Sequence, residues 1–222
     1  MNTRSALIVG ASGLVGRHLL RLLLADDTYS RVTVLTRKSL GFQHPKFLEW
    51  VVNFDELEQH QHLLKGEDIF CCLGTTIKAA GSQGAFRKVD FTYVVQTAAI
   101  SQKNGARQFL VISSLGADVH SRVFYNRVKG EMEHAVAKIP FDAVRIFRPS
   151  RLLGDRRESR LAEALGIFFV KALSALLFIG GMRRYRAIHA QTVAKAMLRA
   201  AEQQIEGVEV VESEEIQSLG LF

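Results

Sequence analysis

Short apolar runs alternate along most of the chain with longer segments of helical periodicity. The apolar runs predict strands, whereas apolar residues recurring every three or four positions predict helices. Most of the strand runs are apolar at every position, which is typical of a parallel sheet covered by helices on both faces. We expect strands at Ala6–Val9, Val32–Leu35, Phe47–Val52, Asp68–Leu73, Phe109–Ser113 and Ala143–Phe147, and helices at Leu14–Leu24, Phe86–Asn104 and Asn126–Lys138.

This alternation over residues 4–148 predicts an α/β fold with a doubly wound parallel sheet, the Rossmann fold. Residues 149–222 are expected to form a small, mostly helical region on the substrate side, with helices near 158–180 and 189–204 and a strand near Val208–Val211. We therefore expect a single domain over residues 1–222, divided into a core (1–148) and the substrate-side region (149–222).

A glycine motif follows the first predicted strand and opens the first predicted helix: residues 7–16 read L-I-V-G-A-S-G-L-V-G. Gly10 would allow the tight turn, Gly13 would let the backbone approach a pyrophosphate, and Gly16 would permit close helix–strand packing. The helix N-terminus would hold the negative charge. Its Gly-x-x-Gly-x-x-Gly spacing resembles that of atypical and extended short-chain dehydrogenase/reductases, so residues 1–148 would be a dinucleotide-binding core.

The second predicted strand ends in Thr36, Arg37 and Lys38, where an NAD site usually carries an acidic residue for the ribose. Arg37 could bind a 2′-phosphate through two hydrogen bonds, and Lys38 could add a point charge. The alternative is a solvated surface pair. These residues favour NADP(H) over NAD(H) as the cofactor.

Further cofactor-binding candidates lie in the glycine loop and after the later strands. Asn53 stands where extended members often have an acid that contacts the adenine amine, and an amide oxygen could accept the same hydrogen bond. The complete cofactor-binding set is Gly10, Ala11, Ser12, Gly13, Leu14, Val15, Gly16, Arg37, Lys38, Asn53, Phe54, Leu73, Gly74, Thr75, Thr76, Lys129 and Pro149. No metal site is expected.

Tyr125 and Lys129 have a Tyr-x-x-x-Lys spacing, which places them on one face of a helix. An ammonium beside a phenol favours the phenolate, so Tyr125 could transfer a proton to or from a substrate oxygen. Ser114, eleven residues before Tyr125, could bind the substrate carbonyl, and we favour it over Ser113 from the spacing usual in the superfamily. The alternative is that Tyr125 packs and Lys129 is solvated.

The superfamily's usual fourth member, an asparagine on the preceding helix, has no evident counterpart. Asn104 lies at a predicted helix end beside Gly105 and is better explained as a cap. The route of a proton relay is therefore left open.

Five segments together carry a closer resemblance: C-L-G-T-T at 72–76, K-V-D-F-T-Y-V at 88–94, I-S-S-L-G-A-D at 112–118, Y-N-R-V-K-G-E-M-E at 125–133 and F-R-P-S-R-L-L-G-D-R-R-E-S-R at 147–160. They are similar to those of the Tat-interacting-protein oxidoreductases, a branch of atypical short-chain dehydrogenases with bacterial relatives. The resemblance covers roughly residues 5–200. It implies NADPH binding and a cytoplasmic protein, and the animal members are regulatory proteins with protein partners.

The formal net charge is +7, but the basic residues are scattered apart from Arg156-Arg157 and the run at 183–186. An anionic cofactor or substrate would use part of this charge, and no nucleic-acid partner is expected. Cys71 and Cys72 are adjacent in an apolar run, which indicates two buried thiols rather than a disulfide framework. With no signal peptide evident, these features favour the cytoplasm.

The apolar run at 166–182 is interrupted by Lys171 and is short for a transmembrane helix. We expect a buried helix, with a protein-facing or membrane-surface helix as the alternative. A homodimer is compatible with the sequence. Arg148, Arg151 or Arg156 could face an anion or pair on the surface, and Tyr185 and His189 are candidates to line a cleft, although a structural role suits His189 better.

Two functions compete on this sequence. The leading one is an NADP(H)-dependent oxidoreductase with a small-molecule substrate, using Ser114, Tyr125 and Lys129 for acid/base chemistry with hydride transfer. The alternative is a non-catalytic NADPH-binding redox sensor or regulatory interaction protein. A third interpretation, an epimerase or dehydratase, shares the fold and triad but normally has a larger substrate region than residues 149–222 provide.

Overall fold

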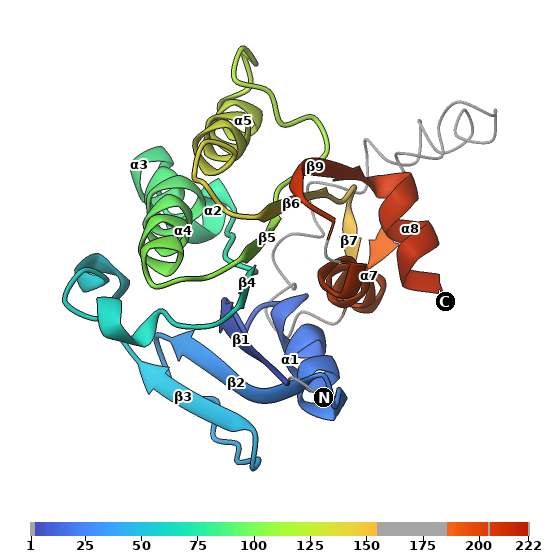
Figure 1. Ribbon diagram of the computed structural model, residues 1–222. Helices are drawn as coiled ribbons and strands as arrows, with labels where there is room; N and C mark the ends of the chain where they lie inside the picture. The colour runs from blue at the N-terminus through green and yellow to red at the C-terminus, as the bar shows by residue number, and fades with distance from the viewer. Residues whose placement is uncertain (1–2, 155–185, 204, 222) are drawn as a thin grey trace.

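A parallel sheet of seven strands forms the centre of the structure, a computed structural model that describes residues 3–154, 186–203 and 205–221 (Figure 1). The strand order is β3-β2-β1-β4-β5-β6-β9. The strands are β1 (Arg4–Val9), β2 (Tyr29–Thr36), β3 (Phe47–Val51), β4 (Asp68–Cys71), β5 (Gln108–Ile112), β6 (Ala143–Arg148) and β9 (Gly207–Glu212). A separate pair, β7 (Leu152–Leu153) and β8 (Ile188–His189), forms a small second sheet.

Helices cover both faces of the large sheet (Figure 1). They are α1 (Gly16–Ala25), α7 (Ala190–Gln203) and α8 (Ser213–Leu221) on one face, and α3 (Gln83–Arg87), α4 (Tyr93–Lys103) and α5 (Phe124–Val136) on the other, with the short α2 (Ile77–Ala80) before α3. A π-helical turn, Lys88–Thr92, joins α3 to α4, and single 3-10 turns occupy Phe54–Glu56 and Gln61–Leu63.

Alternate residues of the central strands enter two hydrophobic layers. In β1, Ala6 and Ile8 pack with α1 and α7, whereas Leu7 and Val9 pack with α4 and α5. All four side chains are fully buried. Two-sided burial explains why the strand sequence is apolar at every position, because successive side chains of a strand point to opposite faces.

The predicted Rossmann fold is confirmed, including the strand near Val208–Val211, which is β9 and joins the sheet beside β6. One expectation needs correction: the helix expected over 86–104 is interrupted by the π turn. The strand expected at 47–52 is present as β3, and as the edge strand it is largely exposed, with Trp50 at 41%. An edge strand has one neighbour, and β3 packs little apolar surface against helices.

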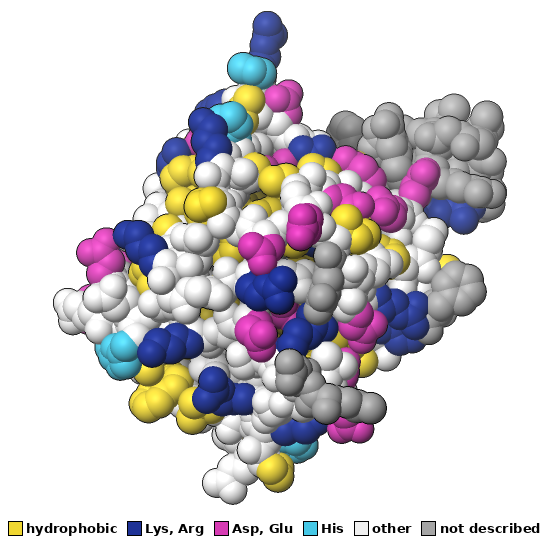
Figure 2. Space-filling model, viewed as in Figure 1, with side chains coloured by type: hydrophobic (Ala, Val, Ile, Leu, Met, Phe, Trp, Pro, Cys, Tyr) yellow, Lys and Arg dark blue, Asp and Glu magenta, His cyan; other side chains and the backbone are white. Residues whose placement is uncertain are grey.

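The helix expected near 158–180, the apolar run 166–182 and the candidates Arg156 and Tyr185 lie outside the described residues. Among the residues that the structure does describe, no helix is both long and apolar enough to span a bilayer. On the face shown in Figure 2, basic and acidic side chains are intermingled and form no single basic patch.

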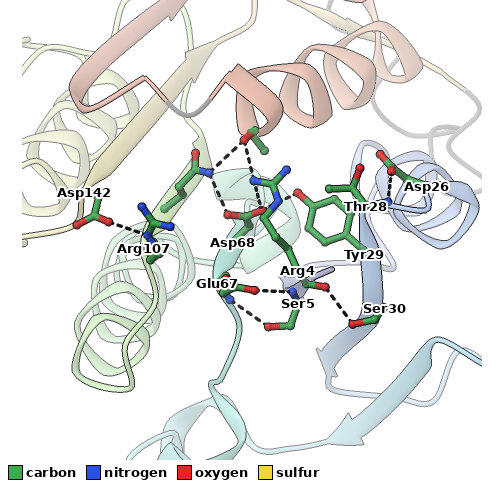
Figure 3. A network of polar contacts seen from close by, with 12 residues as sticks. Arg4, Ser5, Asp26, Thr28, Tyr29, Ser30, Glu67, Asp68, Arg107 and Asp142 are labelled. Carbon is green, nitrogen blue, oxygen red and sulfur yellow. Dashed lines mark hydrogen bonds and ion pairs between the residues drawn. The ribbon is translucent and has the colours of Figure 1, made fainter. Parts of the chain in front are cut away.

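A buried carboxylate ties together the amino ends of the strands (Figure 3). Asp68 at the start of β4 is 1% exposed; it accepts a hydrogen bond of 2.7 Å from the Tyr29 hydroxyl and pairs with the Arg4 guanidinium at 3.0 Å. Gln108 Nε2 donates to its other oxygen at 3.0 Å. Four strands, β1, β2, β4 and β5, therefore meet at one side chain.

The same network reaches the helix layer. Arg4 and Gln108 both donate to the backbone carbonyl of Ala201 in α7, at 3.0 and 3.1 Å. Burial raises the pKa of the Asp68 carboxyl, and the Tyr29 hydroxyl and the Arg4 guanidinium oppose that effect. The hydrogen bonds thus stabilise a carboxylate that burial alone would disfavour.

Replacing Asp68 with alanine should lower the free energy of unfolding by about 3–5 kcal/mol, because Arg4, Tyr29 and Gln108 would lose their buried acceptor. Chemical denaturation measures this change. The matched control is Asp142→Ala, which breaks the exposed Arg107–Asp142 pair close by and should leave the unfolding midpoint near that of the parent. Equal losses in the two variants would show that burial of the Asp68 network contributes nothing.

Candidate functional site

The exits of β1 and β4, meaning the residues that directly follow each strand, approach each other closely at Gly10. This residue has a φ of +81°, and a Cβ there would lie 2.5 Å from the Cys72 carbonyl oxygen. The amide of Gly13 donates to the Gly10 carbonyl at 3.0 Å and closes the turn. Only glycine fits position 10, because a side chain would meet both a steric contact and an unfavourable φ.

Gly16 begins α1 against this turn. A Cβ at residue 16 would lie 2.2 Å from the Gly10 carbonyl oxygen, so the helix start needs a glycine to pack there. Val15, the N-cap residue, supplies no side-chain hydrogen bond to the first turn. A helix N-terminus without a side-chain cap, reached through a glycine loop, suits the diphosphate of a dinucleotide. Ser12 in this loop is exposed.

Arg37 and Lys38 are exposed where β2 ends. The Thr36 hydroxyl donates to the Lys38 carbonyl at 2.8 Å and shapes this turn. Glu49 of β3 lies near, but its carboxylate already accepts hydrogen bonds from the Ser39 hydroxyl at 2.6 Å and the Leu40 amide at 2.8 Å. The cationic side chains are therefore accessible, while the neighbouring acid is engaged.

Asn53 and Phe54 follow β3. The Asn53 side chain is exposed, and its oxygen accepts a 3.1 Å hydrogen bond from the Asp55 amide. Phe54 is buried with its ring 5.6 Å from that of Tyr93. Asp55 pairs with Lys88 at 2.6 Å and accepts from the Tyr93 hydroxyl; hydrogen bonds from both lower the pKa of the Asp55 carboxyl.

The exit of β4 contains the next group of candidates. Gly74 is exposed, the Thr75 amide donates to the Asp90 carboxylate at 2.9 Å, and the Thr76 hydroxyl caps α2 by accepting from Ala79 at 3.1 Å. Leu73 is partly buried. The cysteine prediction needs a correction: Cys71 is buried, and burial raises the pKa of its thiol to about 12, but Cys72 lies just beyond the strand and is partly exposed.

Lys129 is only 3% exposed, so it is not a solvated surface lysine. Its ammonium lies 2.7 Å from Asp90 Oδ1 and 3.5 Å from the Ile112 carbonyl oxygen. Burial would lower the pKa of Lys129, but the charge of Asp90 and, to a smaller extent, Tyr125 and Cys71 raise it. The net effect is a pKa above the ordinary value for lysine, which keeps the ammonium charged.

Tyr125 lies one helical turn before Lys129 in α5 and is partly exposed. Its ring packs on that of Phe86, with centroids 5.1 Å apart. The tyrosine therefore has a packed ring as well as an exposed portion.

The two serines after β5 have different surroundings. The Ser113 hydroxyl is buried and donates to Glu133, whose carboxylate Arg148 holds at 2.5 Å. Ser114 is partly exposed, and its hydroxyl makes a long hydrogen bond of 3.4 Å to the Leu115 carbonyl. Ser113 thus has a short hydrogen bond within the protein, whereas Ser114 has a long one and is partly exposed.

Close packing fixes the serine loop against α5. A Cβ at Gly130 would lie 2.3 Å from the backbone of Asp118, so the absence of a side chain there lets the loop contact the helix. The Asp118 amide donates to the Asn126 carbonyl at 3.1 Å, and the Leu115 amide donates to the Pro149 carbonyl at 3.0 Å. The exits of β5 and β6 and the start of α5 therefore form one packed unit.

Of the arginines considered as anion ligands, Arg148 is engaged within the protein. It pairs with Glu133 and, at 3.0 Å, with Glu212 of β9, which ties α5, β6 and β9 together. Arg151 and His189 are exposed beside the β7–β8 pair.

Asp90 is the residue that sequence reasoning missed. Its side chain is 0% exposed and contacts Lys129 from the helical segment that precedes α5. This is the segment in which the superfamily usually has its asparagine. The sequence signal is the acid within K-V-D-F-T-Y-V at 88–94, which stands out because its neighbours at 89 and 91 are apolar. Asn104, by contrast, is the C-cap of α4, as expected.

The fold and the glycine loop define an NAD(P)-binding protein of the Rossmann class. The model of the NAD(P)H-binding family matches residues 10–159. Rat protein HTATIP2 is 38% identical over 202 residues, which cover 89% of this chain and 81% of the rat protein. The chain belongs to the NAD(P)H-binding family and is an atypical short-chain dehydrogenase/reductase. The predicted resemblance is confirmed.

Other relatives extend this picture. Mitochondrial protein fmp52 of Emericella nidulans is 34% identical over 75% of this chain and 74% of its own. Among solved structures, the UDP-N-acetylglucosamine 4-epimerase of Methanobrevibacter ruminantium M1 aligns with a TM-score of 0.70 at 17% identity, over 96% of this chain and 77% of the epimerase. MoeE5, solved with UDP-glucose and NAD, aligns with a TM-score of 0.69 at 16% identity, over 97% of this chain and 80% of MoeE5. These structures share the fold.

Gly10→Ala should destabilise the protein by about 2–4 kcal/mol, because it combines an unfavourable φ with a clash against the Cys72 backbone. The matched control is Gly81→Ala: its φ is +87°, yet nothing lies within 4 Å of the added Cβ. It should cost about 1 kcal/mol. Thermal denaturation of both variants checks this difference, and equal losses would mean that the close approach at Gly10 is unimportant.

Proposed function

We propose that this protein is an NADP(H)-dependent oxidoreductase acting on a small-molecule carbonyl, alcohol or activated double bond. The observation that carries the proposal is the buried, charged Lys129, one helical turn from the partly exposed Tyr125 and below the exposed Gly74. A solvated lysine would suit many proteins, whereas a buried ammonium beside the β4 exit suits a dinucleotide site.

Different residues at the carboxyl ends of the strands would bind different parts of the cofactor. The glycine loop and the N-terminus of α1 would hold the diphosphate, and Arg37 with Lys38 would select the 2′-phosphate. Asn53 and Phe54 would lie at the adenine, and Leu73, Gly74, Thr75, Thr76 and Pro149 would line the path toward the nicotinamide. The close approach required at Gly10 and Gly16 supports this assignment, because a side chain at either position would displace the backbone that shapes the loop.

Three side chains would act on the substrate. The nicotinamide, when bound, supplies or accepts a hydride. Ser114 would orient the substrate oxygen through its hydroxyl, Tyr125 would transfer the proton at its phenolic oxygen, and Lys129 would hold the ribose and keep positive charge near the phenol. Ser113, engaged with Glu133, would position Ser114 rather than touch substrate.

We also propose a cytoplasmic location, since the unpaired Cys71 and Cys72 suit a reducing compartment. The fungal relatives carry the word mitochondrial in their names, which makes mitochondria the contrary result. Imaging of the tagged full-length protein with a mitochondrial marker separates the two, and co-localisation with the marker would refute the proposal.

Arg37→Ala/Lys38→Ala should weaken NADPH binding by about 100-fold and NADH binding by less than about threefold, because only NADPH carries the 2′-phosphate. Fluorescence titration of the purified protein with each cofactor measures both dissociation constants. The matched control is Arg31→Ala/Lys65→Ala, which removes the same charge from exposed residues near the amino ends of β2 and β4. An equal loss in this control would indicate a general charge effect instead of phosphate recognition.

Tyr125→Phe should lower the rate of NADPH consumption with a responsive carbonyl substrate by about 10²–10⁴-fold and leave NADPH affinity within about threefold, because the hydroxyl transfers the proton. Ser114→Ala should also lower turnover, whereas Ser113→Ala should mainly lower the unfolding temperature. A larger loss of turnover with Ser113→Ala would contradict the assignment of Ser114. Wild-type protein that binds NADPH but turns over none of a broad carbonyl panel would support the sensor alternative.

A further inference from the structure

Asp90 is buried at a junction of three elements that converge on the candidate site. It lies in the π turn Lys88–Thr92, and its side chain is 0% exposed. One carboxylate oxygen contacts the Lys129 ammonium of α5 at 2.7 Å, and the other accepts from the Thr75 amide after β4 at 2.9 Å. A single side chain therefore connects α5 to the loop that follows β4.

The π turn itself has a structural reason in this sequence. Phe86, Asp90 and Val94 are all buried and stand four residues apart. In a regular α-helix, positions repeated at intervals of four drift around the axis, since a turn takes 3.6 residues. The wider π turn offsets this drift and keeps the three side chains on the buried face. Such turns are frequent at functional sites.

The charge of the residue at position 90 determines whether the buried Lys129 keeps its proton. A buried lysine without a partner tends to lose its proton, because the ammonium is poorly solvated in the protein interior. The Ile112 carbonyl, at 3.5 Å, is a weak partner. An asparagine, the residue usual in the superfamily, could accept the Thr75 hydrogen bond through its amide oxygen, but it carries no charge to compensate Lys129. The carboxylate of Asp90 supplies that charge.

The pair also lies close to the surface from which a cofactor would approach. A Cβ added to Gly74 would lie 3.5 Å from Asp90 Oδ1 and 3.9 Å from Lys129 Nζ, and Gly74 is exposed. Among the described residues, the exposed Gly74 backbone therefore lies close to the ion pair. In the part of the chain that the structure describes, the titratable groups that act on the ammonium are the Asp90 carboxylate, the Tyr125 phenol of α5 and the neutral thiol of Cys71 from β4.

We propose that Asp90 is a positioning residue that keeps Lys129 charged and fixed for the cofactor, by a direct ion pair in place of the superfamily's neutral asparagine. This inference rests on the proposed function, because it assigns Lys129 to the cofactor. Its consequence is pH dependence: the wild-type protein should bind NADPH through Lys129 well into the alkaline range. Without the carboxylate, burial lowers the pKa of Lys129, and the contribution of the ammonium is lost as pH rises through that lowered value.

The test is NADPH titration of Asp90→Asn from about pH 6 to about pH 10, where ordinary lysines stay protonated. At the acidic end, affinity should stay within about threefold of wild type, since the ammonium is present in both proteins. Above the lowered pKa of Lys129, the dissociation constant should rise by up to about tenfold per pH unit until the contribution of the ammonium is gone. In wild type it should change by less than about threefold over the same range.

Three controls make the pH profile specific. Lys129→Met and the double variant Asp90→Asn/Lys129→Met should both bind weakly without the added pH dependence, because the titrating group is gone. Asp68→Asn removes an equally buried, paired carboxylate at the opposite end of β4 and should lower stability while keeping the wild-type pH profile. A flat profile in Asp90→Asn, or the same alkaline loss in the double variant, would overturn the proposal.

A second measurement needs neither a folded Asp90 variant nor the cofactor. The Cε signal of Lys129 in protein labelled with ¹³C-lysine, identified by its loss in Lys129→Met, should titrate above about 10.5, the value for an ordinary lysine. Titration below that value in the wild-type protein would refute the role of Asp90 whatever the titrations show. If the NMR result holds but wild-type protein binds neither NADPH nor NADH, the proposed function fails while the ion pair stands.

Discussion

All seven strands of the large sheet run in the same direction, and the arrangement of the site depends on this constraint. Parallel strands deliver their carboxyl ends, and the loops that follow them, to one edge. At the other edge the amino ends gather, where Asp68 accepts hydrogen bonds from two strands, pairs with Arg4 and so connects to α7. The strand direction thus separates a structural network from a candidate functional one.

The two buried carboxylates illustrate this separation. Asp68 is surrounded by Arg4, Tyr29 and Gln108 and is fully explained by its role in joining strands. Asp90 pairs with Lys129 and lies close to the exposed Gly74. A buried ion pair is a weak source of stability, because desolvation offsets much of the attraction. The contacts of Asp90 with Lys129 and with the Thr75 amide after β4 therefore support the proposed role in the site rather than in the core.

Glycines set the spacing at both sides of the site. Gly10 and Gly16 bring the first loop onto Cys72 and onto the start of α1, and Gly130 brings the loop after β5 onto α5. A Cβ at Gly154 would lie 2.7 Å from the Leu14 side chain, so the chain after β7 also packs on the glycine loop. The region after β6 is in this way connected to the dinucleotide-binding core.

The sequence by itself determined the fold class, the positions of strands β1 to β6 along the chain, the glycine loop and the Tyr125–Lys129 spacing. Apolar periodicity and glycine positions are local properties of the chain. The exposure of the edge strand β3 could not be predicted locally, because it depends on which strands have a neighbour on one side only. The spacing in the sequence favoured Ser114 over Ser113, but the hydrogen bond of Ser113 to Glu133, twenty residues away, appears only in the tertiary structure. Only the tertiary structure placed Asp90 against Lys129, because their ion pair joins residues 39 positions apart through the packing of the π turn against α5.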